Sequence, residues 1–380
     1  MLPFIKPKHA DKRKAKSQPR RLVCVRAKKQ QVNVLTFYTK LLGLVGIFIT
    51  DRLQENKLFK TLGMILFNSF WTIISYKHIS SMMIQEKDLD LKIFIFLEHF
   101  SCFVLWWILF FKRFRIHECA SYLHLLRIDL GIKSSPRYHF LVIAINTIVF
   151  CLCIINNLDI HEWSPHEIGE SLGNNPQLSS VLHLIFDSAD VLIHHGLPFI
   201  TSLVYIVLCF EINQLLTRLS KICKKNLSNE NMLWTSLLKA TVRLENGMSM
   251  AIFIFLFRCL VEFLCTLTAI IDYLFGTFEE MYIAFFLLMA VMFSLIVSAA
   301  DVVGKRHSDF KKYILKSILR KMKENHTHPN STNNQYVLFL EIKEDDVSIT
   351  AWKIFILDRR LLLSTTASLL TYGILLYQMK

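Results

Sequence analysis

Long apolar runs, separated by short polar or charged connections, make up most of the chain. Seven of these runs come close to or exceed the ~20 residues that a helix needs to cross the hydrocarbon of a bilayer. They are Leu58–Ser80, Leu91–Phe111, Phe140–Leu158, Val181–Phe210, Met250–Phe275, Met281–Gly304 and Trp352–Tyr377. The pattern therefore predicts an all-α polytopic membrane protein with seven transmembrane helices.

Weaker patterns surround these spans. The run Val32–Ile49 is short and is interrupted by Lys40 and two glycines, so we expect an interfacial helix there rather than a full crossing. The connections Lys112–Ser135 and Glu211–Asn246 carry apolar residues at helical spacing among charges, which predicts helices that continue the fourth, fifth and sixth spans into the cytoplasm and pack there as a bundle. The polar segment Lys321–Asn334 is typical of a disordered loop.

Composition excludes a soluble protein. Hydrophobic residues make up 53% of the 380 residues, and 30 of them are Phe, whereas soluble proteins are ~45–50% apolar. The net charge of +14 owes much to a basic segment before the first span, which we interpret as cytoplasmic charge near an anionic leaflet. Its basic residues lie beside membrane spans without interleaved aromatic residues, so we expect no nucleic-acid partner.

The distribution of Lys and Arg predicts the orientation. With the N-terminus inside, the inner segments 1–57, 112–139, 211–249 and 305–351 together hold 35 Lys and Arg residues. The outer loops hold only Lys87. Because cytoplasmic loops are enriched in Lys and Arg, we expect a cytoplasmic N-terminus and an extracellular C-terminus.

This orientation is opposite to that of a G-protein-coupled receptor. The chain lacks an Asp/Glu-Arg-Tyr motif after the third span and an Asn-Pro-x-x-Tyr motif in the last, and none of its nine cysteines lies in a predicted outer loop. Its glycosylation sequons, at Asn226, Asn325 and Asn330, fall in predicted cytoplasmic segments and are expected to be unused. A receptor of that class or a transporter-type protein is the alternative interpretation, although no convincing internal repeat supports a transporter.

Polar residues within the spans are the candidate functional groups, because placing them in lipid is costly. The fourth span holds His183, Asp187, Asp190 and His194 on one helical face, followed by His195 and by Pro198, which is expected to kink the helix. Three interpretations of this stripe stay open. It stands in the headgroup region, it lines a water-filled ligand pocket, or, least favoured, it binds a metal.

Other spans add a few polar groups. Glu98-His99 in the second span and Asp272-Tyr273 in the fifth are further candidates for lining a pocket, although each alone fits a satisfied buried polar group. Arg258 and Glu262 have the i, i+4 spacing of an intrahelical ion pair, which we interpret as structural. The sequence carries no nucleophile–base pattern, phosphate loop or metal signature, so we expect no enzyme activity, cofactor or metal.

The last residues carry a short motif: Thr371-Tyr372, five mostly apolar residues, then Gln378. It resembles the C-terminal signature of insect gustatory receptors, which is Thr-Tyr, five hydrophobic residues and Gln-Phe. Segments that also resemble this family are Thr350-Ala351, Phe355, Leu357-Asp358-Arg359 and Leu41-Leu42-Gly43-Leu44. Gly373 and Met379 depart from the motif, since they stand where a bulkier hydrophobic residue and Phe are expected.

The resemblance implies a tastant-gated, non-selective cation channel in the plasma membrane of gustatory neurons, including dendrite, axon and soma. It implies a homo- or heterotetramer with other gustatory receptor subunits, in which one C-terminal helix from each subunit surrounds the pore. The pore and gate residues would be Thr371, Tyr372, Ile374, Gln378 and Met379. The spacing of Thr371, Ile374 and Gln378 independently places them on one face, as a hydrated pore requires, although packing against a neighbouring helix is the alternative.

The patterns, together with what the resemblance implies, divide the chain into four parts. Residues 1–57 form a basic cytoplasmic tail with the interfacial helix, and residues 58–210 hold the first four spans as a ligand-binding bundle. Residues 211–350 combine cytoplasmic helical extensions with the fifth and sixth spans. Residues 351–380 form the C-terminal pore helix.

Overall fold

The structure is a computed structural model. It describes residues 42, 47, 57–84, 89–132, 192–225, 230–274, 280–324, 336–337, 339–340, 342–343, 348–351 and 353–379. The third predicted span, Phe140–Leu158, lies outside the described residues, as do the first part of the fourth span and the three sequons.

Helices make up nearly all of the described chain, which confirms the all-α class. They are α3 (Lys57–Ile84), α4 (Leu89–Asp129), α8 (Leu197–Lys225), α9 (Glu230–Leu274), α10 (Glu280–Glu324) and α12 (Arg359–Met379), with a π-helical turn η2 (Leu192–Gly196) before α8. Two short strands, β1 (Thr350–Ala351) and β2 (Phe355–Ile356), pair antiparallel with Thr350 opposite Ile356. Lys353, in the turn between them, has a φ of 60°.

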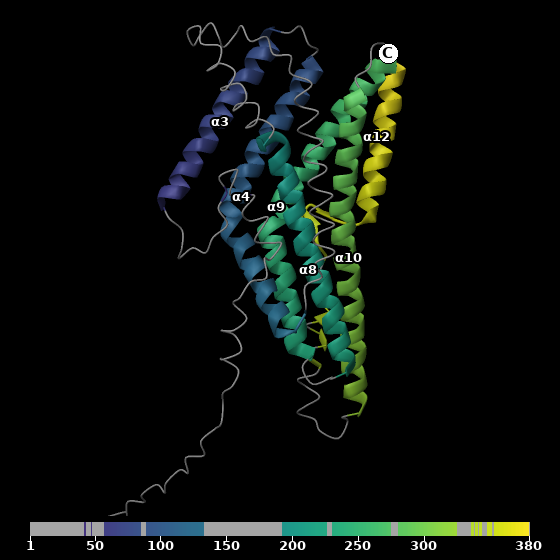
Figure 1. Cartoon of the computed structure of the whole chain (residues 1–380). Coiled ribbons are helices and arrows are strands. Elements are labelled where there is room, and N and C mark those ends of the chain that lie inside the picture. Colours follow the sequence, from purple (N-terminus) through teal and green to yellow (C-terminus); the bar gives the residue numbers. More distant parts are fainter. Residues whose placement is uncertain are drawn as a thin grey trace, which may run out of the picture.

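Four long helices, α4, α8, α9 and α10, pack along one another as a bundle with a continuous apolar core (Figure 1). Trp106 of α4 and Phe255 of α9 are among the largest fully buried side chains. On one side, α3 is attached to α4 by Phe67, whose ring stacks on that of Trp106 with centroids 3.9 Å apart. On the other side, α12 lies against α9 and α10 and reaches along only one half of the bundle (Figure 1).

Four of the described helices are long and apolar enough to cross a membrane. Their apolar stretches are Ile193–Cys223, Trp234–Thr268, Phe286–Lys323 and Arg359–Gln378. These agree with the predicted fourth, fifth, sixth and seventh spans, while the total of seven spans and the orientation of the termini stay predictions.

Helix continues beyond the predicted spans, while the cytoplasmic location of these extensions stays a prediction. The second span continues without a break to Asp129, the fourth continues to Lys225, and the fifth is preceded by helix from Glu230. The helix α4 ends at Asp129, and the φ of +61° at Gly131, two residues later, allows the Ile132 amide to donate to the Arg127 carbonyl at 3.1 Å. The apolar face of the Glu211–Asn246 segment packs into the core as expected; its members Ile212, Leu215, Leu216 and Leu219 are buried.

Some predicted boundaries were wrong. The last helix begins at Arg359 and not at Trp352, because the two-stranded hairpin occupies the residues before it. The Asp358 carboxylate accepts from the amides of Arg360 (2.9 Å) and Leu361 (3.3 Å), so Asp358 is the N-cap that starts the helix. The segment expected to be a loop from Lys321 is helical as far as Glu324. The predicted interfacial run is described only at Leu42 and Ile47, and both side chains are fully buried.

Candidate functional site

One guanidinium and two carboxylates meet inside the bundle where α4 packs against α9. Nη2 of Arg258 lies 2.7 Å from Oε1 of Glu98 on α4 and 3.3 Å from Oε1 of Glu262, one turn further along α9. Nη1 of the same guanidinium donates to Sγ of Cys102 on α4. The Arg258–Glu262 pair predicted from spacing is therefore present, and Glu98 extends it into a bridge between two helices. Removing one partner of such a buried ion pair strongly destabilises a protein, because the remaining charge is left buried without an opposite charge.

A pair of imidazoles lies beside this ion cluster. Nδ1 of His99 and Nε2 of His194 are 2.9 Å apart, which is hydrogen-bond distance, and the two rings meet edge to face with centroids 4.1 Å apart. His99 is on α4 and His194 is in η2, so this bond crosses between segments 95 residues apart. Because a hydrogen bond between two ring nitrogens needs one donor and one acceptor, at least one of the two rings is uncharged.

The turn η2 positions two consecutive histidines at the start of α8. Pro198, expected to kink this helix, has no N–H and so leaves the carbonyl four residues earlier, that of His194, without its usual helical donor. The Cys102 thiol donates to that carbonyl at 3.7 Å instead. The chain accommodates Pro198 by a π-helical turn over the preceding residues rather than by a simple kink, and such turns are frequent at functional sites.

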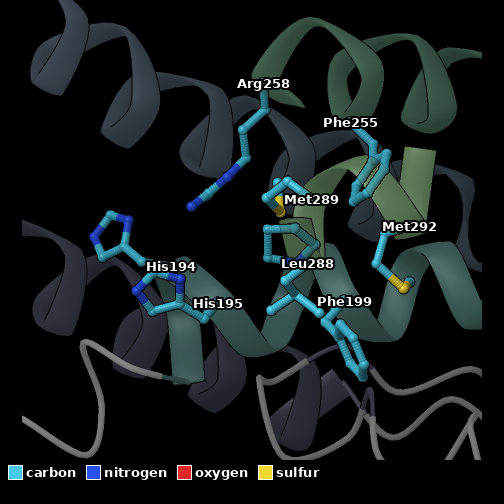
Figure 2. Close-up of a pocket in the computed structure, with 9 residues that line it drawn as sticks. His194, His195, Phe199, Phe255, Arg258, Leu288, Met289 and Met292 are labelled. Carbon is cyan, nitrogen blue, oxygen red and sulfur yellow. The ribbon is translucent and has the colours of Figure 1, made fainter. Parts of the chain in front are cut away.

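A small cavity opens between η2, α8, α9 and α10. Its lining residues are His194, His195, Pro198, Phe199, Phe255, Arg258, Leu288, Met289 and Met292. In Figure 2 the Arg258 side chain extends toward the side where His194 and His195 lie, and Phe199, Phe255 and Met292 are on the other side. The cavity volume is about 20 Å³, which leaves room for about one water molecule.

The structure brings together four of the residues that the sequence singled out as pocket candidates. Glu98, His99, His194 and His195 lie at the cavity or directly behind its wall. His183, Asp187 and Asp190 lie outside the described residues, and Tyr273 lies in the last turn of α9.

Sequence reasoning missed Arg258 as a pocket residue. It assigned this arginine only an intrahelical partner, although a second carboxylate, that of the half-buried Glu98, stood in another apolar span. Two acidic residues and one basic residue in spans that are otherwise apolar were the available signal. Cys102 carried no signal of its own.

The C-terminal helix α12 presents most of its surface away from its own chain. Of its apolar stretch, 6% is buried against the rest of the described chain. Its half-buried side includes Tyr372 and Gly373 and faces α9, where a Cβ added to Gly373 would lie 3.3 Å from Cδ2 of Leu267. The departure of Gly373 from the motif thus coincides with a close approach of two helices, where small residues are favoured.

The exposed side of α12 has two zones at helical spacing. One is lined by polar side chains and is interrupted by apolar ones; its members are Ser364, Ala367, Ser368, Thr371, Ile374, Leu375 and Gln378. The other is mostly apolar, with Leu363, Thr366, Leu370 and Tyr377. The expectation that Thr371, Ile374 and Gln378 share a face fits the first zone, whereas Tyr372 lies on the half-buried side.

The first turn of α12 is attached to α10 by an ion pair. Oδ2 of Asp301 lies 3.1 Å from Nε of Arg359 and 2.6 Å from Nζ of Lys305, which is one turn further along α10. The Asp301 side chain is 6% exposed, whereas those of Arg359 and Lys305 are 70% and 59% exposed. One buried carboxylate therefore serves a partner on its own helix and one on α12.

Comparison with solved structures identifies the fold. The chain is similar to the insect olfactory receptor OR5 from Machilis hrabei in complex with eugenol, with a TM-score of 0.65 and 13% identity over 91% of this chain and 98% of that one. It is also similar to a structure of the same receptor described without eugenol, with a TM-score of 0.58 and 10% identity over 92% and 100% of the two chains. No protein-family model and no curated protein sequence matches the chain. The fold is that of an insect olfactory receptor, and both neighbours are receptors rather than enzymes.

Proposed function

We propose that the chain is a subunit of a ligand-gated, non-selective cation channel of the insect chemoreceptor type, and that its ligands are tastants. The fold shared with an insect olfactory receptor supports the chemoreceptor class. The motif from Thr371-Tyr372 to Gln378 favours the gustatory branch over the olfactory one. The expected assembly is a tetramer of this chain alone or with other gustatory receptor subunits, in the plasma membrane of gustatory neurons.

The observation that carries this proposal is the exposed surface of α12. A helix of this length and apolarity has to be covered by lipid or protein, and the rest of the described chain covers very little of it. Lipid suits the apolar zone that contains Leu363 and Leu370, but it does not explain a second zone of hydroxyl and amide groups. Several copies of α12 around a common axis would turn the polar zone toward water and leave the apolar zone for protein or lipid.

The chemistry of the polar zone suits cation passage. The hydroxyls of Ser364 and Thr371 donate to carbonyls of their own helix, at 3.1 and 2.9 Å. Their oxygens keep lone pairs that can accept from water or face a hydrated cation. Ile374 and Leu375 interrupt this zone between Thr371 and Gln378, so a constriction that closes by dewetting would lie between two polar rings.

The ligand site in this proposal is the cavity beside the ion cluster. It has an apolar wall and a few polar groups, which is typical of small-molecule sites. Three of its lining residues, Leu288, Met289 and Met292, are on α10, and the same helix holds α12 through Asp301 and Arg359. A ligand that displaces α10 would thereby act on the first turn of the pore helix.

Electrical recording tests the channel directly. The full-length chain is expressed in a cell line and a panel of bitter and sweet tastants is applied while G-protein signalling is blocked. A tastant-evoked cation current that persists under the block is expected. A current that disappears with the block would show a G-protein-coupled receptor instead.

A matched pair of threonines tests which zone of α12 lines the pore. Thr371 and Thr366 are both exposed and both donate to the carbonyl four residues earlier at 2.9 Å, but they lie in different zones. The Thr371→Cys variant should be modified by a charged thiol reagent with loss of current, and the Thr366→Cys variant should not. Equal modification at both positions, or unchanged permeation after Gln378→Ala, would contradict pore lining by the polar zone.

A further inference from the structure

Exposed basic side chains gather where the start of α12 meets α10. Residues 301–306 of α10 and 358–360 at the start of α12 are joined by the Asp301–Arg359 ion pair, so they lie at the same level of the bundle. They include four exposed cations, which we call the basic junction: Lys305, Arg306, Arg359 and Arg360. Both carboxylates of these residues are engaged, since Asp301 is buried beside two of the cations and Asp358 accepts from the amides that begin α12. The exposed surface at this level is therefore positively charged.

The positive charge of the basic junction is only partly matched by carboxylates of the described chain. Arg306 and Arg360 form no ion pair with any described residue. The next acidic residue along α10, Asp309, is exposed one turn further on, where Lys312 offsets its charge. Positive charge at the inner end of a span also orients a membrane protein, but orientation does not require the charges of two helices to converge. The convergence favours a site for an anion.

Exposed hydrocarbon lies next to these cations on both helices. On α12, Leu363 and Leu370 follow Arg359 on the same face, and both are exposed. On α10, exposed apolar side chains precede Arg306 on its own face; they are Leu295 and Val302. From the basic junction the two helices run side by side to the same end of the bundle (Figure 1). A basic level followed by apolar stripes has the order of headgroup and acyl chains in a phospholipid.

We infer that the basic junction binds the headgroup of an anionic phospholipid, whose acyl chains lie along the exposed apolar residues of α12 and α10. In the predicted orientation this lipid belongs to the cytoplasmic leaflet, which is the anionic one. The site is a different surface from the cavity beside Arg258, and it does not depend on which tastant opens the channel.

Arg359 has suitable donors for the lipid phosphate. Its Nε contacts Asp301, and its two Nη groups have no hydrogen-bond partner among the described residues. Guanidinium groups bind phosphate oxygens through two parallel hydrogen bonds. A zwitterionic headgroup gains less at this site, because its ammonium group is repelled by the same four cations. A free phosphate also gains less, because it brings no acyl chain to the apolar residues beside the junction.

Three phosphodiesters test the inference on the purified full-length protein in an uncharged detergent. Dioctanoylphosphatidylglycerol has acyl chains and a negative headgroup, dioctanoylphosphatidylcholine has the same chains and no net charge, and glycerophosphoglycerol has the negative headgroup without chains. Binding is measured from the ligand-dependent rise in Tm. Dioctanoylphosphatidylglycerol should bind at least tenfold more tightly than either of the others, because each basic side chain beside an anionic headgroup changes affinity about fivefold. Equal binding of the two lipids would overturn the inference, and equal binding of glycerophosphoglycerol would show a site for soluble phosphates instead.

Two double variants locate the site. Arg306→Gln with Arg360→Gln removes the two cations that have no ion pair in the described chain, so no carboxylate loses a partner and folding should be unaffected. The two remaining cations are balanced by the two carboxylates of the junction, and the preference for dioctanoylphosphatidylglycerol over dioctanoylphosphatidylcholine should fall below threefold. Lys316→Gln with Lys323→Gln is the control, because it removes the same charge from exposed positions of α10 that lie at least ~15 Å further along the helix. The control should keep the tenfold preference, and an equal loss in both double variants would refute a local site.

The remaining outcomes separate this inference from the channel proposal. Native mass spectrometry of the same sample gives the number of subunits and of bound lipids. An oligomer that binds neither lipid would show that a neighbouring copy covers the apolar stripes, which would also overturn the inference. Selective lipid binding by a protein that gives no tastant-evoked current would support the lipid site and contradict the channel. An evoked current together with equal binding of the two lipids would support the channel and contradict the lipid site.

Discussion

The contact between Asp301 and Arg359 predicts how strongly α10 controls the C-terminal helix. Asp301→Asn removes the carboxylate that holds Arg359 of α12 and Lys305 of α10. In the proposed channel, a cavity with room for about one water molecule corresponds to the state without ligand, which we expect to be the closed one. Weakening a contact of the closed state should raise the current without ligand and lower the ligand concentration needed for half-maximal response.

The size of the effect on gating follows from the solvent exposure of the Arg359 side chain. Arg359 is 70% exposed, and an ion pair with a partner in solvent contributes ~0.2–1 kcal/mol. The closed-to-open ratio per subunit should therefore change by at most about fivefold, since 1.4 kcal/mol corresponds to a factor of ten. The neutral amide that replaces the carboxylate leaves Arg359 in water rather than as a buried unpaired charge, so no larger folding penalty is expected.

Patch-clamp recording of a double-mutant cycle is the assay, with surface expression measured in parallel. Arg359→Gln should reproduce the effect of Asp301→Asn, and the double variant should add little, because both changes remove one interaction. Lys305→Gln is the matched control. It removes the other partner of Asp301, and because Lys305 lies on α10 itself, this second contact does not connect α10 to α12. Additive effects in the double variant, or an equal effect of Lys305→Gln, would refute a mechanical link through this pair.

Three further predictions concern local features. Gly373→Ala should be tolerated, because the added Cβ lies 3.3 Å from a movable Leu267 methyl group, whereas Gly373→Leu should displace α12 from α9 and change gating in the same recordings. Asp358→Ala should cost ~0.5–2 kcal/mol of helix stability and speed hydrogen exchange at the amides of Arg360 and Leu361, while Asp358→Asn, which keeps a capping oxygen, should not. Burial raises the pKa of the Cys119 thiol to about 12, so this thiol should stay protonated and resist maleimide at pH 8 until the protein is unfolded, as read by mass spectrometry.

Hydrophobic periodicity was sufficient to predict the long helices that the structure describes, but not all of their boundaries. Runs of apolar residues locate the part of a helix that lies in lipid, and they do not show where the backbone stops being helical. The end of α4 depends on the left-handed backbone of Gly131, and the start of α12 depends on the Asp358 carboxylate. Each of these boundaries depends on a single residue. A hydropathy profile averages over a run of about twenty residues, so one residue changes it little.

Only part of the candidate site could be predicted from the sequence, because several of its contacts join different helices. Residues on one helix, such as His194 and His195, can be grouped from their spacing alone. The contact of Glu98 with Arg258 joins residues 160 positions apart, and it depends on which helices are neighbours in the bundle. The sequence alone does not show which helices are neighbours, so Arg258 was assigned only its partner within the same helix.

The unbroken length of α10 has a mechanical consequence. From Met292, beside the cavity, to Glu324 the helix continues for 32 residues without a break, which is ~48 Å at 1.5 Å per residue. A rigid rod of that length acts as a lever arm: a tilt of about 5° at the cavity would carry its far end about 4 Å sideways. Rearrangements too small to notice around a ligand would then be readily measured as distance changes between spectroscopic labels at the opposite end of the bundle.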